Sequence, residues 1–288
     1  MNAQPQLIQI DEPHSTHNIK DQHPSDQHDR ERALEVKIPR ELAPSAAIMK
    51  LVDEASRRFN LIERGDRVAV GCSGGKDSLM MISALRALQR RDDYDFEMQV
   101  IHLDQQQPGF ERALFNESVA RLGVECEVIT RDTWSVVESQ RKPGQIPCAI
   151  CGRLRRGILN RWCAERGFNK LALGHHLDDA LETFMLNMLF GRRLDPLKPL
   201  TEASDVPVST IRPLLLVEER KVKAWVARSG LTPVPCPVCD SFPDAKRRDL
   251  KQLLSGLGDA QPELYASARE AIYGERSPLD FSFTPRGG

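Results

Sequence analysis

The sequence lacks a long apolar run, an excess of one charge and a large aromatic content. No apolar stretch in its 288 residues approaches the roughly 20 residues of a membrane span, so we expect no membrane contact. The formal net charge of −1 gives no global argument for a nucleic-acid partner, and any such contact must come from local basic clusters. With three tyrosines and three tryptophans, no aromatic platform for stacked bases can be inferred.

The N-terminus also lacks the basic region and apolar segment of a secretory signal. We therefore expect a cytoplasmic protein, and seven cysteines in a reducing compartment are more often metal ligands or redox groups than disulfide partners. Residues 1–45 are polar and without periodicity, which predicts a disordered extension. Its histidines, His14, His17, His23 and His28, leave a metal-binding tail as the alternative.

Strands and helices alternate from about residue 46 to residue 232. Apolar patterns predict strands at 67–71, 97–103, 124–129 and 170–173, with a closing strand near 211. Helices are predicted at 48–62, 79–88, 110–122, 179–190 and 217–228, and a loop with three prolines at 192–207. Such alternation implies right-handed crossovers, so we predict an α/β fold with a Rossmann-like open parallel sheet. The remaining segment, 233–288, adds helices at 245–257 and 262–273.

A glycine loop, Ser73 to Ser78, lies where the first strand gives way to a helix. Backbone N–H groups and the helix dipole bind phosphate at such positions. Gly74 and Gly75 allow close approach of the backbone, Lys76 adds a point charge, and the two terminal serines add hydroxyl donors. The pattern is not Walker A, and an ordinary glycine turn is the weaker interpretation.

The hexapeptide resembles the PP-loop signature of the ATP pyrophosphatases, which cleave ATP between its α and β phosphates. The resemblance implies that Ser73 to Ser78 bind the departing pyrophosphate, while Mg2+ and Lys76 stabilise charge on the phosphates. Asp77 becomes a candidate metal-associated catalytic carboxylate, with helix capping as its alternative role. Asp104, at the carboxyl end of the second strand, is expected to contact the nucleotide.

A second block, Leu173 to Asp179, also follows a strand and resembles the G-H-x-x-D-D block of related PP-loop enzymes. The resemblance implies that Gly174 and His175 approach the nucleotide. It also implies that Asp178 or Asp179 binds metal or positions the base, and Asp178 is our catalytic candidate. The structural alternative is an aspartate that begins a helix beside a partly buried histidine pair.

Two C-x-x-C pairs form the second strong pattern: Cys148 with Cys151, and Cys236 with Cys239. Such pairs suggest a four-thiolate zinc site, although the 84 intervening residues are many for a local zinc ribbon. A redox dithiol is disfavoured because neither pair is predicted to open a helix after a strand. We assign the isolated cysteines to packing: Cys72, Cys126 and Cys163.

The residues from Cys148 to Leu159 resemble the tRNA 2-thiocytidine synthetases, and five more blocks do so in order along the chain. These blocks are 103–110, 174–179, 186–188, 211–214 and 235–239. The resemblance implies a four-iron, four-sulfur (4Fe-4S) cluster held by Cys148, Cys151 and one member of the second pair, where we favour Cys239 over Cys236. Three protein ligands leave one iron open to a sulfur species.

Basic residues follow the first cysteine pair on a predicted helix: Arg153, Arg155 and Arg156, with Arg161 beyond. Arg153 and Arg156 are three positions apart and share a face. They form either a solvated helix face or RNA phosphate contacts, as do two further clusters, 192–193 and 246–248.

We therefore predict an ATP-dependent tRNA sulfurtransferase that adenylates a cytidine in the anticodon arm and then transfers sulfur through the cluster. The resemblance implies ATP, Mg2+, the 4Fe-4S cluster, tRNA and a cysteine desulfurase as sulfur donor, and it leaves a homodimer open. One alternative is a lysidine-synthetase-like enzyme, since Leu181 to Thr183 resembles that branch. The other is a non-catalytic zinc or cluster protein that binds nucleotide for regulation.

Overall fold

The computed structural model describes residues 39–141, 147–236, 245–279 and 281. Residues 1–38 of the expected N-terminal extension, which include its four histidines, and the favoured ligand Cys239 lie outside the described residues. Within the described ranges, no helix combines the length and the apolar character needed to cross a membrane.

A six-stranded sheet with the order β3-β2-β1-β4-β6-β5 forms the centre of the described part. All neighbouring strands are parallel except β5 and β6. The strands are β1 (Asp66–Gly71), β2 (Phe96–Asp104), β3 (Cys126–Thr130), β4 (Lys170–Ala172), β5 (Leu200–Glu202) and β6 (Ser209–Ile211). The strand order reverses beside β1, and open sheets bind ligands at the carboxyl ends of strands at such a point. The predicted α/β fold with a parallel sheet is confirmed.

Nine helices are present in the described part of the chain. They are α2 (Ala46–Arg58), α3 (Lys76–Gln89), α4 (Arg112–Leu122), α5 (Trp134–Gln140), α6 (Cys148–Glu165), α7 (Leu177–Gly191), α8 (Glu219–Ser229), α10 (Ala245–Ala260) and α11 (Leu264–Tyr273).

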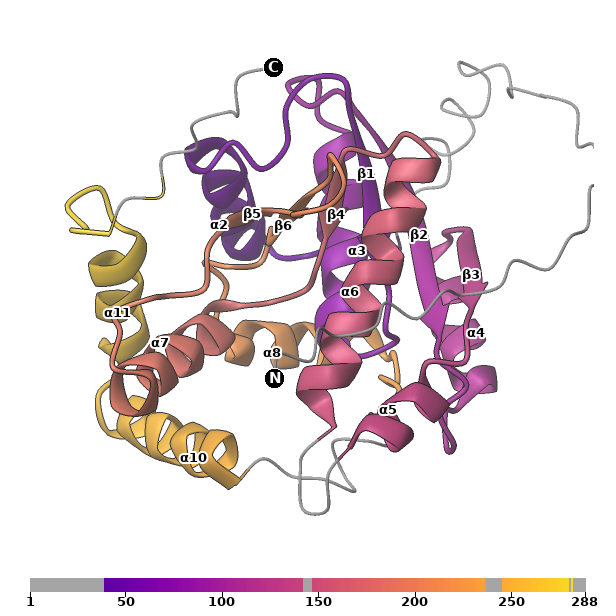
Figure 1. The fold of residues 1–288 in the computed structure, drawn as a ribbon. Helices are drawn as coiled ribbons and strands as arrows, with labels where there is room; N and C mark the ends of the chain where they lie inside the picture. The colour runs from indigo at the N-terminus through magenta and orange to yellow at the C-terminus, as the bar shows by residue number, and fades with distance from the viewer. Residues whose placement is uncertain (1–38, 142–146, 237–244, 280, 282–288) are drawn as a thin grey trace, which may run out of the picture. The chain divides into compact units, whose positions relative to one another are not determined.

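Helices cover both faces of the sheet, because successive side chains of a strand point in opposite directions. Val68 and Val70 of β1 belong to the larger core, which includes buried residues of α2, α3, α4 and α8. Ala69 belongs to a smaller core, in which Leu159 and Trp162 of α6 pack on the other face. Figure 1 shows α6 lying in front of the parallel strands.

Two details of the chain differ from the predicted elements. The segment 192–207 is not a continuous loop, because Leu200–Glu202 pairs with β6 as an antiparallel edge strand. A strand of three residues beside prolines is too short for a periodic pattern. Packed structure also begins before the first predicted helix, since Leu42 is buried and its carbonyl accepts hydrogen bonds from Ser83 and Trp225.

The two C-terminal helices pack on α7, as Figure 1 shows for α10 and α11. Leu250 and Leu254 of α10 and Tyr273 of α11 are buried in the larger core. The Tyr273 hydroxyl donates a 2.6 Å hydrogen bond to the carbonyl of Leu197. Both helices are therefore part of the same core as the sheet, and they place side chains beside the first turn of α7.

Candidate active site

The glycine loop from Ser73 to Ser78 joins β1 to α3 as predicted, with Gly75 as the N-cap of the helix. Its two serines fold it. The Ser78 hydroxyl donates to the carbonyl of Gly75 at 2.9 Å and accepts from the backbone N–H of Ser73 at 3.2 Å. The backbone N–H of Gly75 lies 3.3 Å from the Ser73 hydroxyl oxygen, which accepts its hydrogen. The loop is thus shaped before any phosphate reaches the helix N-terminus.

Two glycines allow other segments to approach this loop closely. Gly74 has a φ of +79°, and a Cβ there would lie 2.8 Å from a methyl group of Val234. A Cβ on Gly174 would lie 3.0 Å from the carbonyl carbon of Asp77. The backbone N–H of Val234 donates to the carbonyl of Gly74 at 2.9 Å. The chain leading to Cys236 is therefore bound directly to the phosphate loop.

The charged groups of the loop form a compact ion-pair network. Lys76 Nζ lies 2.8 Å from Asp77 Oδ2 and 3.0 Å from Glu219 Oε1. Asp77 Oδ1 in turn lies 3.5 Å from His176 Nε2. Burial disfavours the charge on Lys76, but Asp77 and Glu219 outweigh it and raise the pKa of the ammonium group. Lys76 therefore carries a positive charge at the helix N-terminus where phosphate would bind.

The two neighbouring aspartates of the second block have different contacts. Asp179 completes a capping box with His176: its carboxylate accepts from the His176 backbone N–H at 3.0 Å, and its own N–H donates to His176 Nδ1. Asp178 accepts a 2.7 Å hydrogen bond from the backbone N–H of Glu219. Burial raises the pKa of Asp178. Helix capping thus accounts for Asp179, while Asp178 connects α7 to the start of α8.

His175 offers an unsatisfied polar atom next to the loop. Its Nδ1 is buried and has no hydrogen-bond partner among the residues that the structure describes. Burial first, and then the charge of Arg212, lower the pKa of the imidazole to about 4. A neutral ring with an unpaired buried nitrogen fits a nucleotide contact, which is the role that its sequence block implies.

Asp104 lies at the carboxyl end of β2, as predicted, and is 6% exposed. Its carboxylate forms an ion pair with Arg112 and accepts a 3.0 Å hydrogen bond from the backbone N–H of Gln106. Burial opposes ionisation, but these two partners prevail and lower the pKa of Asp104. Any contact of Asp104 with a nucleotide is therefore shared with the guanidinium of Arg112.

The first cysteine pair lies on the first turn of α6, three positions apart on one face. Cys148 is exposed, and the half-buried Cys151 donates from Sγ to Gln105 Oε1 at 3.2 Å. Burial raises the pKa of Cys151 against the opposing effects of Arg155 and Gln105, and the nearby Cys236 raises it further. Since Gln105 directly follows β2, the thiols lie at the same sheet edge as the phosphate loop.

Cys148 opens the helix α6, which is one of the two features expected of a redox dithiol. The element before it along the described chain is α5, however, and not a strand of the thioredoxin type. No group of three Cys, His, Asp or Glu side chains that could hold a metal is formed by the described residues alone. The described candidate ligands are all thiols: the predicted Cys148 and Cys151 and the alternative Cys236. Thiols are soft donors, and a site made of them suits an iron–sulfur cluster or zinc.

The three predicted RNA-binding arginines do not share one environment. Arg153 and Arg156 are exposed on α6, in keeping with their spacing, whereas Arg155 is half-buried. After burial, the charge of Arg155 is among the effects that lower the pKa values of His102 and His175. After burial, the charge of Arg156 likewise contributes to lowering the pKa of Arg212. Arg155 and Arg156 therefore both influence buried groups near the site, while Arg153 and Arg156 are the two exposed members.

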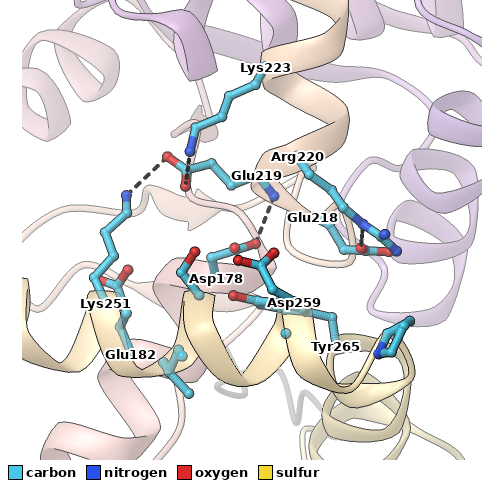
Figure 2. Close-up of a pocket in the computed structure, with 13 residues that line it drawn as sticks. Asp178, Glu182, Glu218, Glu219, Arg220, Lys223, Lys251, Asp259 and Tyr265 are labelled. Carbon is cyan, nitrogen blue, oxygen red and sulfur yellow. Dashed lines mark hydrogen bonds and ion pairs between the residues drawn. The ribbon is translucent and has the colours of Figure 1, made fainter.

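The structure adds Arg112 and Glu219, which sequence patterns did not indicate, and it gives a contact to Gln105, which lies in the family-like block 103–110 but had no predicted role. Figure 2 shows the Glu219 carboxylate between Lys223 and Lys251. These residues line a cavity of about 150 Å³ together with Asp178 and Tyr265. The i,i+4 spacing of Glu219 and Lys223 on α8 was visible in the sequence. Contacts between distant segments, such as Glu219 with Lys76, leave no linear signal.

An open parallel sheet with a shaped phosphate loop between β1 and α3 defines a PP-loop protein, and residues 46–234 match the family model described as PP-loop domain. The chain is 40% identical over 222 residues to the tRNA-cytidine(32) 2-sulfurtransferase of Alkalilimnicola ehrlichii, over 77% of this chain and 71% of that protein. It is also 40% identical over 208 residues to the Vibrio cholerae protein of the same name, over 72% and 67% respectively. The chain therefore belongs to the PP-loop family and, within it, to the family of the tRNA-cytidine(32) 2-sulfurtransferases.

A solved structure shares the fold. The U34-tRNA thiolase NcsA from Methanococcus maripaludis, determined with its 4Fe-4S cluster, aligns with a TM-score of 0.62 and 23% identity. The alignment covers 77% of this chain and 76% of that chain. At 23% identity, this likeness concerns the fold, that is, the arrangement of the helices and strands.

Proposed function

We propose that the protein is an ATP-dependent tRNA sulfurtransferase that replaces the C2 carbonyl oxygen of cytidine 32 with sulfur. One observation carries the proposal: a single sheet edge brings together a phosphate loop and a thiol pair. Cys151 donates to Gln105 at the end of β2, and β2 pairs with β1, which leads into the loop at Ser73. The named relatives, at 40% identity, support the choice of substrate.

The first half of the proposed reaction is adenylation of the cytidine. The C2 carbonyl oxygen attacks the α phosphorus of ATP, the bond to the bridging oxygen breaks, and pyrophosphate leaves. A carbonyl oxygen is a very poor leaving group, whereas AMP is a good one. The N–H groups at the start of α3 and the ammonium of Lys76 would stabilise charge on the departing pyrophosphate.

Mg2+ fits this site through the carboxylate of Asp77, whose side chain is 28% exposed beside Lys76. The ion, when bound, supplies further stabilisation of the phosphate charge. Asp178 would act by fixing the first turn of α7 against α8, through its 2.7 Å hydrogen bond to Glu219 N–H. His175, neutral at physiological pH and with an unpaired Nδ1 among the described residues, would bind the nucleotide.

The second half of the reaction requires sulfur at the adenylated C2 atom and expels AMP. A 4Fe-4S cluster would be held by Cys148, Cys151 and one cysteine of the second pair, with Cys239 favoured, and it supplies an iron with an open position for sulfur. Gln105 would orient Cys151, and Arg155 would add positive charge beside the thiols. A cysteine desulfurase is the proposed sulfur source, and Arg153 and Arg156 are proposed to bind tRNA phosphates.

The test is a reaction of anaerobically purified, cluster-reconstituted protein with ATP, a sulfide source and tRNA. We expect AMP and 2-thiocytidine in equal amounts, and Lys76→Ala should abolish both products. Cys151→Ala should abolish 2-thiocytidine and the release of AMP but not the release of pyrophosphate, since the adenylation residues remain while no sulfur expels AMP from the adenylated cytidine. AMP formation that depends on added lysine, with no thiolated nucleoside, would instead establish the lysidine-type reaction.

A further inference from the structure

The Glu219 carboxylate binds three ammonium groups at once. Lys76, Lys223 and Lys251 each place Nζ 3.0 Å from one of its two oxygens. The three lysines come from α3, α8 and α10, and Figure 2 shows the two from α8 and α10 on either side of the carboxylate. Glu219 is 5% exposed, and despite burial Lys223, Lys251 and Lys76 together lower its pKa.

The three partners of Glu219 differ in what else they can do. Lys76 belongs to the phosphate loop, where its ammonium group is needed by an incoming triphosphate. Lys223 and Lys251 have side-chain exposures of 61% and 48%, and they hold no position in the loop. The cavity is also lined by Asp178, Glu182 and Asp259, and Lys251 opposes the rise that burial causes in the pKa of Glu182, so Lys251 serves more than one carboxylate. Lys223 and Lys251 are nevertheless the two cations that stay on Glu219 when Lys76 leaves it.

If Lys76 were the only partner of the buried Glu219, its departure would leave a buried carboxylate without a counter-ion. That outcome is strongly unfavourable. With Lys223 and Lys251 in place, Glu219 keeps two partners after Lys76 leaves. The two outer lysines therefore lower the free-energy cost of moving Lys76 from the carboxylate to another anion. Asp77 stays beside Lys76 on the loop, 2.8 Å away, so the ammonium group has a second anchor during the move.

We propose that Lys76 exchanges Glu219 for the phosphates of ATP, and that Lys223 and Lys251 permit the exchange by neutralising Glu219 after Lys76 has left. Glu219, Lys223 and Lys251 are thus positioning residues that act through Lys76 and do not touch the nucleotide. The inference rests on the proposed function only in that the loop binds ATP. Through Lys251, helix α10 thereby affects the affinity of the phosphate loop for ATP.

The experiment is direct titration of ATP binding, by calorimetry with a non-hydrolysable ATP analogue and Mg2+, without tRNA or a sulfur source. We expect the double variant Lys223→Met/Lys251→Met to bind the analogue about tenfold more weakly, because Glu219 then retains Lys76. Adding Glu219→Gln to that double variant should restore affinity to within about twofold of wild type. Lys221→Met is the matched control, because Lys221 also lies on α8 but pairs with Glu218, 3.3 Å away.

The effect of adding Glu219→Gln distinguishes the exchange of Lys76 from two simpler roles of Lys223 and Lys251. If Lys223 and Lys251 contact the nucleotide themselves, or only brace the helices, Glu219→Gln will not restore binding, and the exchange is refuted. Unchanged affinity in the double variant refutes it as well. A wild-type protein that binds no ATP analogue overturns the proposed function, whereas normal binding without rescue overturns the exchange alone. Thermal unfolding of every variant shows that the comparison is between folded proteins.

Discussion

Close contact at the phosphate loop depends on single glycines whose roles can be separated. Gly74 combines a φ of +79° with a Cβ position 2.8 Å from Val234 and 2.9 Å from Phe115, so any side chain there meets both backbone strain and packed atoms. Gly75 has a φ of −73°, and a Cβ there would have the Ser73 hydroxyl 3.4 Å away as its nearest neighbour. The two adjacent glycines therefore differ in their need for a hydrogen in place of a side chain.

Gly74→Ala should lower the free energy of unfolding by roughly 2 kcal/mol, because of a left-handed backbone and a displaced Val234. Gly75→Ala should change it by less than about 0.5 kcal/mol, since an alanine fits that conformation. Urea unfolding of both variants in the absence of ATP measures the difference. Equal losses in the two variants would contradict the assignment of strain to Gly74.

At the scale of elements, α6 presents several functional groups from one helix. Its first turn carries Cys148 and Cys151, its next turns carry the exposed Arg153 and Arg156, and its end packs Trp162 against the sheet. The helix thus fixes the distance between the thiols and the outer basic surface. An RNA phosphate bound by the arginines would lie one to two helical turns, about 5 to 10 Å along the axis, from the cysteine pair.

Arg153→Ala/Arg156→Ala should weaken tRNA binding and reduce the slope of log K against log salt by about 1 to 2, as expected for the loss of two phosphate contacts. Binding isotherms between low and moderate salt measure this slope. Arg64→Ala is the control, because Arg64 is exposed just before β1, at the sheet edge opposite the phosphate loop. An unchanged slope in the double variant would assign Arg153 and Arg156 to a solvated helix face.

Prediction from sequence succeeded at the element scale where a local pattern exists. The strand-to-helix position of Ser73 to Ser78 and the parallel order of the sheet follow from alternating periodicities and were confirmed. A helix was predicted after the first cysteine pair, but its start at Cys148 was missed, since Pro147 forms no side-chain cap and arginines and glycines interrupt the apolar pattern of α6. The ion pair between Glu219 and Lys76 could not be predicted, because it arises only when α8 packs against α3.

At the scale of the whole described molecule, Tyr273 joins segments from distant parts of the sequence. Its ring lies edge-on to Phe59, just after α2, at 6.1 Å between centroids, and its hydroxyl donates to Leu197 in the segment between α7 and β5. The side chain is 1% exposed. One residue of the last helix therefore contributes both to the core and to the position of a loop that follows the active-site helix.

Tyr273→Phe should cost about 1 kcal/mol in the free energy of unfolding, as expected for one buried hydrogen bond. Tyr273→Ala should cost roughly 3 to 5 kcal/mol, because it also leaves a cavity where the ring was. Chemical denaturation of the two variants measures both values. Equal effects would show that the hydroxyl, and not the packed ring, accounts for the contribution of Tyr273.

The hydrogen bond from Val234 to the carbonyl of Gly74 limits how this chain can change during evolution. Cys236 follows Val234 by two residues, so the register of that short segment sets where the thiol lies relative to the phosphate loop. An inserted or deleted residue between the two would either break the hydrogen bond or move the thiol by about 3.5 Å. Length variation should therefore accumulate elsewhere in the chain, while the spacing between Val234 and Cys236 stays fixed even where the side chains change.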